Sequence, residues 1–206
     1  MSSRVYAFLL LAGALAFGGA GLVHPILLGD ATGQLAVIAA TPHWHAIHWT
    51  LLFALPAMAV GLVAFALDAG SGAGSRAAVV GALVAVLGFA VLSLNILFMA
   101  GAGAALARTP GPDAVFVYGM IHPAGLAAER EATVILGVAV YLIGRASLLA
   151  ARPPRWLALG GVAAGTVAAL GAAVTSELGL TMYYCQGLLV TWMVVAGALG
   201  LVRRAS

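Results

Sequence analysis

The sequence predicts an all-α protein: an integral membrane bundle of about six transmembrane helices that forms a single domain over residues 1–206. Three observations predict this fold. Hydrophobic residues make up 64% of the chain and charged residues only 7%, and the mean hydropathy is +1.12, a balance outside the range of soluble proteins. Long apolar runs recur along the chain, and the segments between them are short and rich in Gly, Ser and Pro.

Five uncharged runs are each long enough to cross a hydrocarbon core of about 30 Å at a rise of about 1.5 Å per residue. They predict spans at about residues 5–28, 46–67, 77–104, 156–176 and 178–202. The first run could instead be a cleaved signal peptide, because Arg4, an apolar core and Gly18-Gly19-Ala20 form an acceptable cleavage pattern. Its apolar run is longer than the usual hydrophobic region of a signal peptide, so we expect the segment to be retained.

The fourth span is ambiguous because Glu129-Arg130-Glu131 interrupts its apolar run. A span over about 115–144 would place three charges near the bilayer centre, whereas a span over about 127–150 leaves them at the interface. We expect the second register, in which Arg145 extends its charge toward the interface. Residues 114–126, which contain His122-Pro123, would then form a re-entrant or surface segment.

Arginine predicts the orientation, since the chain has nine arginines and no lysine. In a six-span arrangement one side receives most of them: Arg4, Arg76, Arg145, Arg152, Arg155, Arg203 and Arg204. The positive-inside rule makes this side cytoplasmic and places both termini there. Because the arginines are scattered between apolar runs, we expect no nucleic-acid partner, and the main partner is the lipid bilayer of the cell membrane. The absence of lysine also excludes a retinal Schiff base.

The same arrangement places all five histidines on the outer side of the membrane: His24, His43, His45, His48 and His122. The positive-inside rule does not count histidine, so this segregation needs another reason. His45 and His48 are three residues apart and share a helix face. His24 and His122 both occur in the pattern Gly, two apolar residues, His, Pro, in which proline leaves a backbone carbonyl without its helical donor. We expect these four rings to approach one another.

Other polar and aromatic groups are assigned to the interior or to the interface. Asn95 in the third span should face the interior. The last span carries a polar line that should also turn inward: Glu177, Thr181, Tyr184 and Thr191, with Gln186 nearby. Three further rings are expected to form an interfacial belt at headgroup level: His43, Trp44 and Trp49.

The leading functional hypothesis is a redox or electron-transfer protein with a transition-metal centre near its outer face. Haem b could be held by two histidines, for which His24 and His122 are candidates. Arg108 or Arg130 would then lie near its propionates. A copper-like ion could instead be held by nitrogen ligands with one carboxylate. Its candidate ligands are His24, His45, His48, His122 and Asp30.

Two alternatives come from other functional classes. The first is a metal-free enzyme that transfers protons on a lipophilic small molecule, with Glu129, Glu131 or Glu177 as acid or base and a histidine as partner. Burial of the Glu129-Arg130-Glu131 triplet would favour it. The second is an accessory subunit of a larger membrane complex, or a permease for a metal or small solute. The almost wholly apolar cytoplasmic halves of the predicted helices argue against an ion path.

Overall fold

The computed structural model describes residues 3–70, 72–175 and 180–202, and within these ranges it contains helices and no strand, as predicted. The helices are α1 (Ser3–Val23), α2 (Ala31–Ala40), α3 (Trp44–Ala69), α4 (Ser75–Phe98), α5 (Ala104–Arg108), α6 (Pro112–Ala150), α7 (Arg155–Val174) and α8 (Leu180–Val202). A 3-10 turn, Gly72–Gly74, precedes α4, and a π-helical turn, Met99–Gly103, joins α4 to α5.

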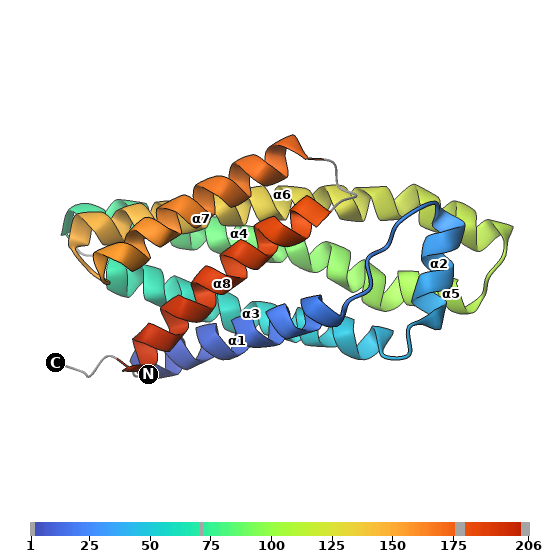
Figure 1. Cartoon of the computed structure of the whole chain (residues 1–206), viewed down its shortest axis with the longest axis horizontal. Helices are drawn as coiled ribbons and strands as arrows, with labels where there is room; N and C mark the ends of the chain where they lie inside the picture. Colours follow the sequence, from blue (N-terminus) through green and yellow to red (C-terminus); the bar gives the residue numbers. More distant parts are fainter. Residues whose placement is uncertain (1–2, 71, 176–179, 203–206) are drawn as a thin grey trace.

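Six helical segments of the described chain are long and apolar enough to cross a membrane: Arg4–Val23, Trp44–Ala69, Gly72–Arg108, Pro112–Ala150, Arg155–Val174 and Leu180–Val202. Their exposed surfaces carry large apolar side chains, as a lipid-facing surface requires. The chain is therefore a multi-pass membrane protein. Helix α1 begins and α8 ends at the same end of the bundle (Figure 1). The prediction that this end is cytoplasmic stays a prediction.

The six long segments form a closed ring in the order of the chain. Helix α1 packs on α3, α3 on α4, α4 on α6, α6 on α7, α7 on α8, and α8 returns to α1. Small residues bring the neighbours close together. A Cβ atom added at Gly137 or Gly144 of α6 would lie 2.7 Å from a backbone nitrogen of α7. The α6–α7 pair is thus held in backbone contact.

Helix α6 corrects the predicted fourth span. Residues 114–126 belong to one continuous helix of 39 residues, Pro112–Ala150, so the expected re-entrant segment and the break after residue 126 are wrong, whereas the register of the fourth span in the membrane stays a prediction. At about 1.5 Å per residue this helix is about 59 Å long, which exceeds a hydrocarbon core of about 30 Å. The charged triplet does not require the helix to break, because consecutive residues of a helix point in different directions and the three charges can therefore face different surroundings. Glu129 faces the interior, whereas Arg130 and Glu131 pair at 3.6 Å on the outside.

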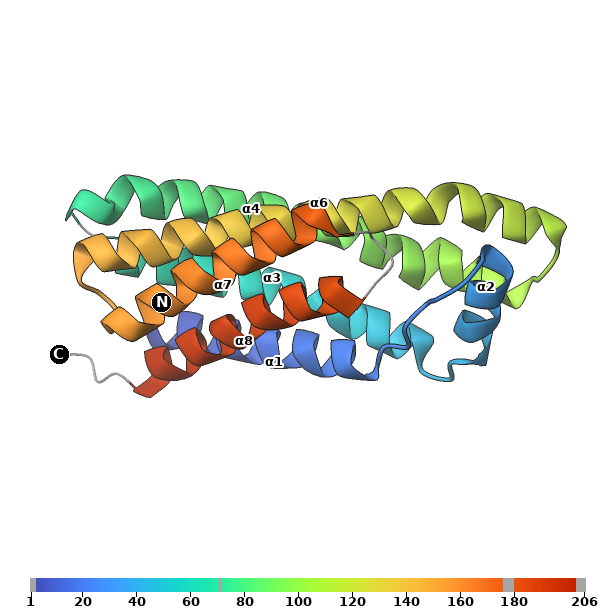
Figure 2. The same cartoon turned by 45° about the horizontal axis from the view of Figure 1, so that its top comes forward.

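Helix α2 lies across the end of the bundle opposite the one where α1 begins and α8 ends, and we call this end the α2 end (Figures 1 and 2). An extended segment, 24–30, leads into it from α1. Asp30 caps its N-terminus by accepting a hydrogen bond from the Gly33 amide at 2.8 Å. Leu35 and Ile38 of α2 are buried with Leu27 in a small apolar cluster. The segment 24–30 is therefore held at its middle, by Leu27, and at its C-terminal end, by Asp30.

Candidate functional site

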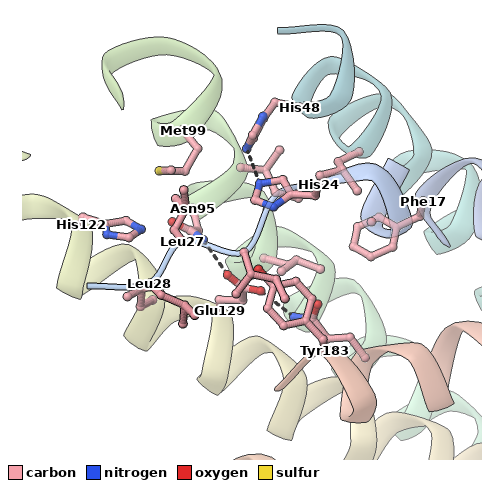
Figure 3. Close-up of a pocket in the computed structure, with 17 residues that line it drawn as sticks. Phe17, His24, Leu27, Leu28, His48, Asn95, Met99, His122, Glu129 and Tyr183 are labelled. Carbon is pink, nitrogen blue, oxygen red and sulfur yellow. Dashed lines mark hydrogen bonds between the residues drawn. The ribbon is translucent and has the colours of Figure 1, made fainter. Parts of the chain in front are cut away.

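A cavity of about 100 Å³ lies beneath the segment 24–30, where α1, α3, α4, α6 and α8 approach one another (Figure 3). Its lining combines polar and apolar side chains. The polar ones are His24, His48, Asn95, His122, Glu129, Tyr183 and Gln186, and the apolar ones include Phe17, Leu27, Leu51, Leu92, Ile96 and Met99. The helices therefore bring together three of the five histidines and one carboxylate.

The two imidazoles of His24 and His48 meet through their Nε2 atoms, 3.3 Å apart. The second ring nitrogen of His48, Nδ1, lies 2.9 Å from the carbonyl oxygen of Trp44. Because a carbonyl only accepts, His48 Nδ1 must donate, and in a neutral ring its Nε2 then accepts. His24 Nε2 is consequently the donor. Nδ1 of His24 is then unprotonated and carries a lone pair, and this buried atom has no hydrogen-bond partner.

Trp44 holds the histidine pair in place, although the sequence assigned it to the interface. Its side chain is only 3% exposed, so the interfacial-belt prediction is wrong for this residue, whereas Trp49 is 44% exposed. The indole Nε1 donates to the carbonyl of Met99 at 2.9 Å, where the π-helical turn begins. The indole also packs on both imidazoles, with centroids 4.2 Å from His48 and 5.2 Å from His24.

Glu129 presents a carboxylate that receives one amide donor on each oxygen. Asn95 Nδ2 donates to Oε2 at 2.7 Å, and Gln186 Nε2 donates to Oε1 at 2.9 Å. Gln186 is also 3.2 Å from the hydroxyl of Thr133, one turn further along α6. Asn95 reaches α6 opposite Gly125, where an added Cβ would collide with its Oδ1 atom. Glycine at 125 is therefore what allows this close approach.

Burial and the neighbouring ring of His48 lower the pKa of His24 from its ordinary value of 6.5 to about 4. At neutral pH the ring is therefore uncharged. A neutral imidazole has one nitrogen that donates and one that accepts, which agrees with the hydrogen-bond pattern around His24.

His122 lines the same cavity but stands apart from the His24–His48 pair (Figure 3). Its ring stacks on Tyr118, with centroids 4.6 Å apart. Tyr118 in turn donates to Gln34 Oε1 at 3.2 Å, and Gln34 Nε2 donates to the Gly29 carbonyl at 3.0 Å. Helix α2 thus fixes the far wall of the cavity through side chains, and His122 belongs to that wall.

Several predicted site residues lie elsewhere. His45 is exposed and lies 2.8 Å from Arg108, and Asp30 serves as the cap of α2. Arg130 and Glu131 lie on the outer surface of α6, and Glu177 is outside the described residues. The polar line predicted on the last span is wrong in the described part of that helix, because Thr181, Tyr184 and Thr191 are exposed and Gln186 is the group that turns inward.

The predicted metal ligands do not assemble into one centre. Within the ranges 3–70, 72–175 and 180–202, no group of three or more His, Cys, Asp or Glu side chains is arranged to hold a metal ion. The haem and copper hypotheses therefore stay predictions.

Sequence reasoning missed two structural supports of the site, Trp44 and Gly125. Trp44 precedes His48 by one helical turn, and Gly125 precedes Glu129 by one turn, so each shares a face with a polar residue that was singled out. That spacing was the available signal. No family model, curated protein or solved structure matches this chain, so its function must be inferred from the site alone.

Proposed function

We propose that this protein is a membrane-embedded enzyme that transfers a proton on a lipophilic small molecule, with Glu129 as the base and the His24–His48 pair as the hydrogen-bond acceptor. One observation carries the proposal: the carboxylate of Glu129 and the bare Nδ1 atom of His24 belong to the same cavity inside the bundle. Ionisable groups within transmembrane helices are rare and are usually functional.

The hydrogen bonds of Glu129 support its role as the base. Both carboxyl oxygens accept from an amide N–H, and neither faces an acceptor to which a carboxyl O–H could donate in these contacts. These two hydrogen bonds favour the carboxylate form, against the burial of the group, which favours the neutral acid. Each oxygen keeps a second lone pair with which it can accept a proton. Glu129 is thus a positioned proton acceptor, held by helices α4 and α8 on either side of its own helix.

His24 has the complementary role in this proposal. Its pKa of about 4 keeps the ring neutral at pH 7, so it does not compete with Glu129 for the proton. Before the transfer, its Nδ1 lone pair accepts a hydrogen bond from the substrate group and orients it, and this group then turns its hydrogen toward Glu129. The bond between the substrate atom and its hydrogen breaks, the electron pair stays on the substrate, and the proton binds Glu129. Turnover requires Glu129 to return the proton to a second substrate atom or to the aqueous phase.

A chromophoric phenol tests this proposal, because a phenol and its phenolate absorb at different wavelengths. The probe is 4-nitrophenol with an octyl chain, added to the protein in detergent at a pH below the pKa of the probe in detergent alone. We expect the bound probe to show the phenolate spectrum. Glu129→Gln should bind the probe and leave it as phenol, whereas the exposed control Glu131→Gln should behave as the wild type. A phenolate spectrum that survives in Glu129→Gln contradicts the proposal.

A transition-metal centre is the second candidate, and one observation favours it: three of the predicted ligands, His24, His48 and His122, line one cavity. Against it, the cavity of about 100 Å³ is smaller than cofactor pockets of about 300–1,000 Å³, so a haem would require the helices to separate. An absorption spectrum combined with metal analysis distinguishes the two candidates. A Soret band, or copper in stoichiometric amount, would replace the proton-transfer proposal.

A permease is less well supported than either candidate. Most of the described side chains that are buried between the cavity and the opposite end of the bundle are apolar, for example Leu10, Met58 and Leu62. The buried hydroxyl of Ser147 is already bonded to the carbonyl of Ile143 at 2.8 Å. A polar path across the membrane is not formed by these residues. An accessory role in a larger complex stays a prediction.

A further inference from the structure

Helices α1 and α8 pack tightly at one end and separate toward the cavity. A Cβ added at Gly197 would lie 2.7 Å from the Leu11 backbone nitrogen, and one at Gly18 would lie 3.2 Å from Val190. Nearer the cavity, a Cβ added at Gly21 of α1 or Gly187 of α8 meets no atom within 4 Å. Figure 1 shows the two helices crossing and then diverging toward the α2 end. The α1–α8 seam is therefore open along the part that borders the cavity.

The open part of this seam leads into the cavity and has an apolar rim. Phe17 and Gly21 of α1 and Tyr183 and Gln186 of α8 all line the cavity. The side chains next to them on the outer surface are strongly exposed: Leu22 is 90% exposed, Val23 66%, Leu28 62% and Tyr184 72%. In a multi-pass protein such a surface faces lipid. Within the described part of the chain, the cavity thus borders the bilayer rather than the aqueous phase alone.

Two of the polar groups that line the cavity offer acceptors to a ligand. The Nδ1 atom of His24 has a lone pair and no donor, and the Glu129 carboxylate accepts through both oxygens. The amide group of Gln186 donates to Glu129 and to Thr133, and the amide group of Asn95 donates to Glu129. A ligand group that donates a hydrogen bond, such as a hydroxyl, matches these two acceptors.

We infer that the cavity binds the hydroxyl head of a lipid-soluble phenol or alcohol, which enters from the bilayer between α1 and α8 and leaves its apolar tail in the seam. This inference rests on the proposed function and names its substrate class. The volume supports it, because about 100 Å³ accommodates a small head group but not a whole lipophilic molecule. Among the described residues, the exposed seam gives the remaining apolar part a route out of the cavity with matching chemistry.

A graded series of substitutions at Gly21 tests the access route. Gly21 lines the cavity, and a Cβ added there meets no atom within 4 Å, so Ala, Val and Leu place side chains of increasing size at this point of the seam. Gly19 is the matched control, since it lies on the same helix, is exposed, has the same free space and does not line the cavity. Thermal unfolding of each variant verifies that the fold is intact.

Binding of octyl-4-nitrophenol to the protein in phosphatidylcholine vesicles is followed by quenching of tryptophan fluorescence. We expect Gly21→Leu to weaken binding at least tenfold, Gly21→Ala and Gly21→Val to have smaller effects in order of size, and Gly19→Leu to bind as the wild type. Nitrophenol without the chain should bind the wild type at least tenfold more weakly. Unchanged binding to Gly21→Leu, or equal binding of the chainless probe, overturns the inference.

The two proposals can fail separately in this experiment. If Gly21→Leu blocks binding while the probe bound to the wild type stays a phenol, the ligand class and route hold and proton transfer is wrong. If the phenolate forms equally in the wild type and in Gly21→Leu, proton transfer holds and the route is wrong.

Discussion

His24 and His48 lie 24 residues apart in the chain, yet their Nε2 atoms are 3.3 Å apart at the wall of the cavity. His24 ends up there because α1 stops at Val23 and the chain continues as an extended segment toward α2. His48 is held by its own helix, through the carbonyl of Trp44 one turn earlier. Because this carbonyl can only accept, it determines which ring nitrogen donates in each histidine, and it therefore also leaves Nδ1 of His24 without a hydrogen.

Replacing His48 by Leu should destabilise the protein. The substitution removes the acceptor of His24 Nε2–H, and an unsatisfied buried donor costs about 1–3 kcal/mol. The thermal unfolding midpoint in detergent should fall accordingly. His45→Leu is the control, because His45 is exposed and its contact with Arg108 is on the surface. Equal shifts for the two variants would contradict the role given to the pair.

The stability of the protein should decrease as the pH falls from about 6.5 to about 4. His24 is neutral in the folded state, where its pKa is about 4, and it binds a proton near pH 6.5 when unfolded. Acid therefore favours the unfolded state over this window, by at most about 3 kcal/mol for this residue, and the effect levels off below pH 4. Above pH 6.5 this contribution is fully present.

Chemical denaturation at a series of pH values measures this dependence. The variant His24→Gln cannot titrate, so its curve should be flatter than that of the wild type between pH 6.5 and 4. Parallel curves for the two proteins would show that His24 is not buried in its neutral form.

Gly125→Ala should uncouple Asn95 from Glu129. The added methyl group collides with Asn95 Oδ1, so α4 and α6 must separate or the amide must turn away from the carboxylate. We expect a loss of about 1–3 kcal/mol of stability, the cost of a broken buried hydrogen bond, and a weaker phenolate signal from the nitrophenol probe. Gly119→Ala in the same helix is the control, because its Cβ would meet Ala31 at an ordinary 3.7 Å. The prediction fails if Gly119→Ala is the more damaging of the two.

Trp44→Phe should remove the indole donor to the Met99 carbonyl while keeping a ring against both imidazoles. The carbonyl of a π-helical turn would then be left without this partner, at a cost of about 1–3 kcal/mol. Trp49→Phe serves as the comparison, since Trp49 is 44% exposed and surface substitutions usually change stability by less than about 0.5 kcal/mol. Thermal unfolding of both variants measures the difference. If Trp44→Phe leaves the unfolding midpoint unchanged, Trp44 does not stabilise the site through this hydrogen bond.

The membrane class and the six long apolar helices could be read from the chain, because hydrophobicity and segment length are local properties. Asn95, Gln186 and Glu129 were already candidates, since polar groups at membrane depth avoid lipid whatever their partners are. The break proposed before the charged triplet failed, however. Whether Glu129, Arg130 and Glu131 share one environment depends on the rotation of α6 against its neighbours, and no local pattern contains that rotation.

From its residues alone, this protein is determined to be a lipid-embedded helical bundle with several histidines and carboxyl groups that need partners. Only the tertiary structure decided which of them meet. His45 and His48 looked equivalent on one helix face, but the path of residues 24–30 and the position of Trp44 brought His48 inside and left His45 beside Arg108 at the surface. Partner choice among polar groups is a long-range outcome of helix packing, since each hydrogen bond needs its two atoms within about 3 Å.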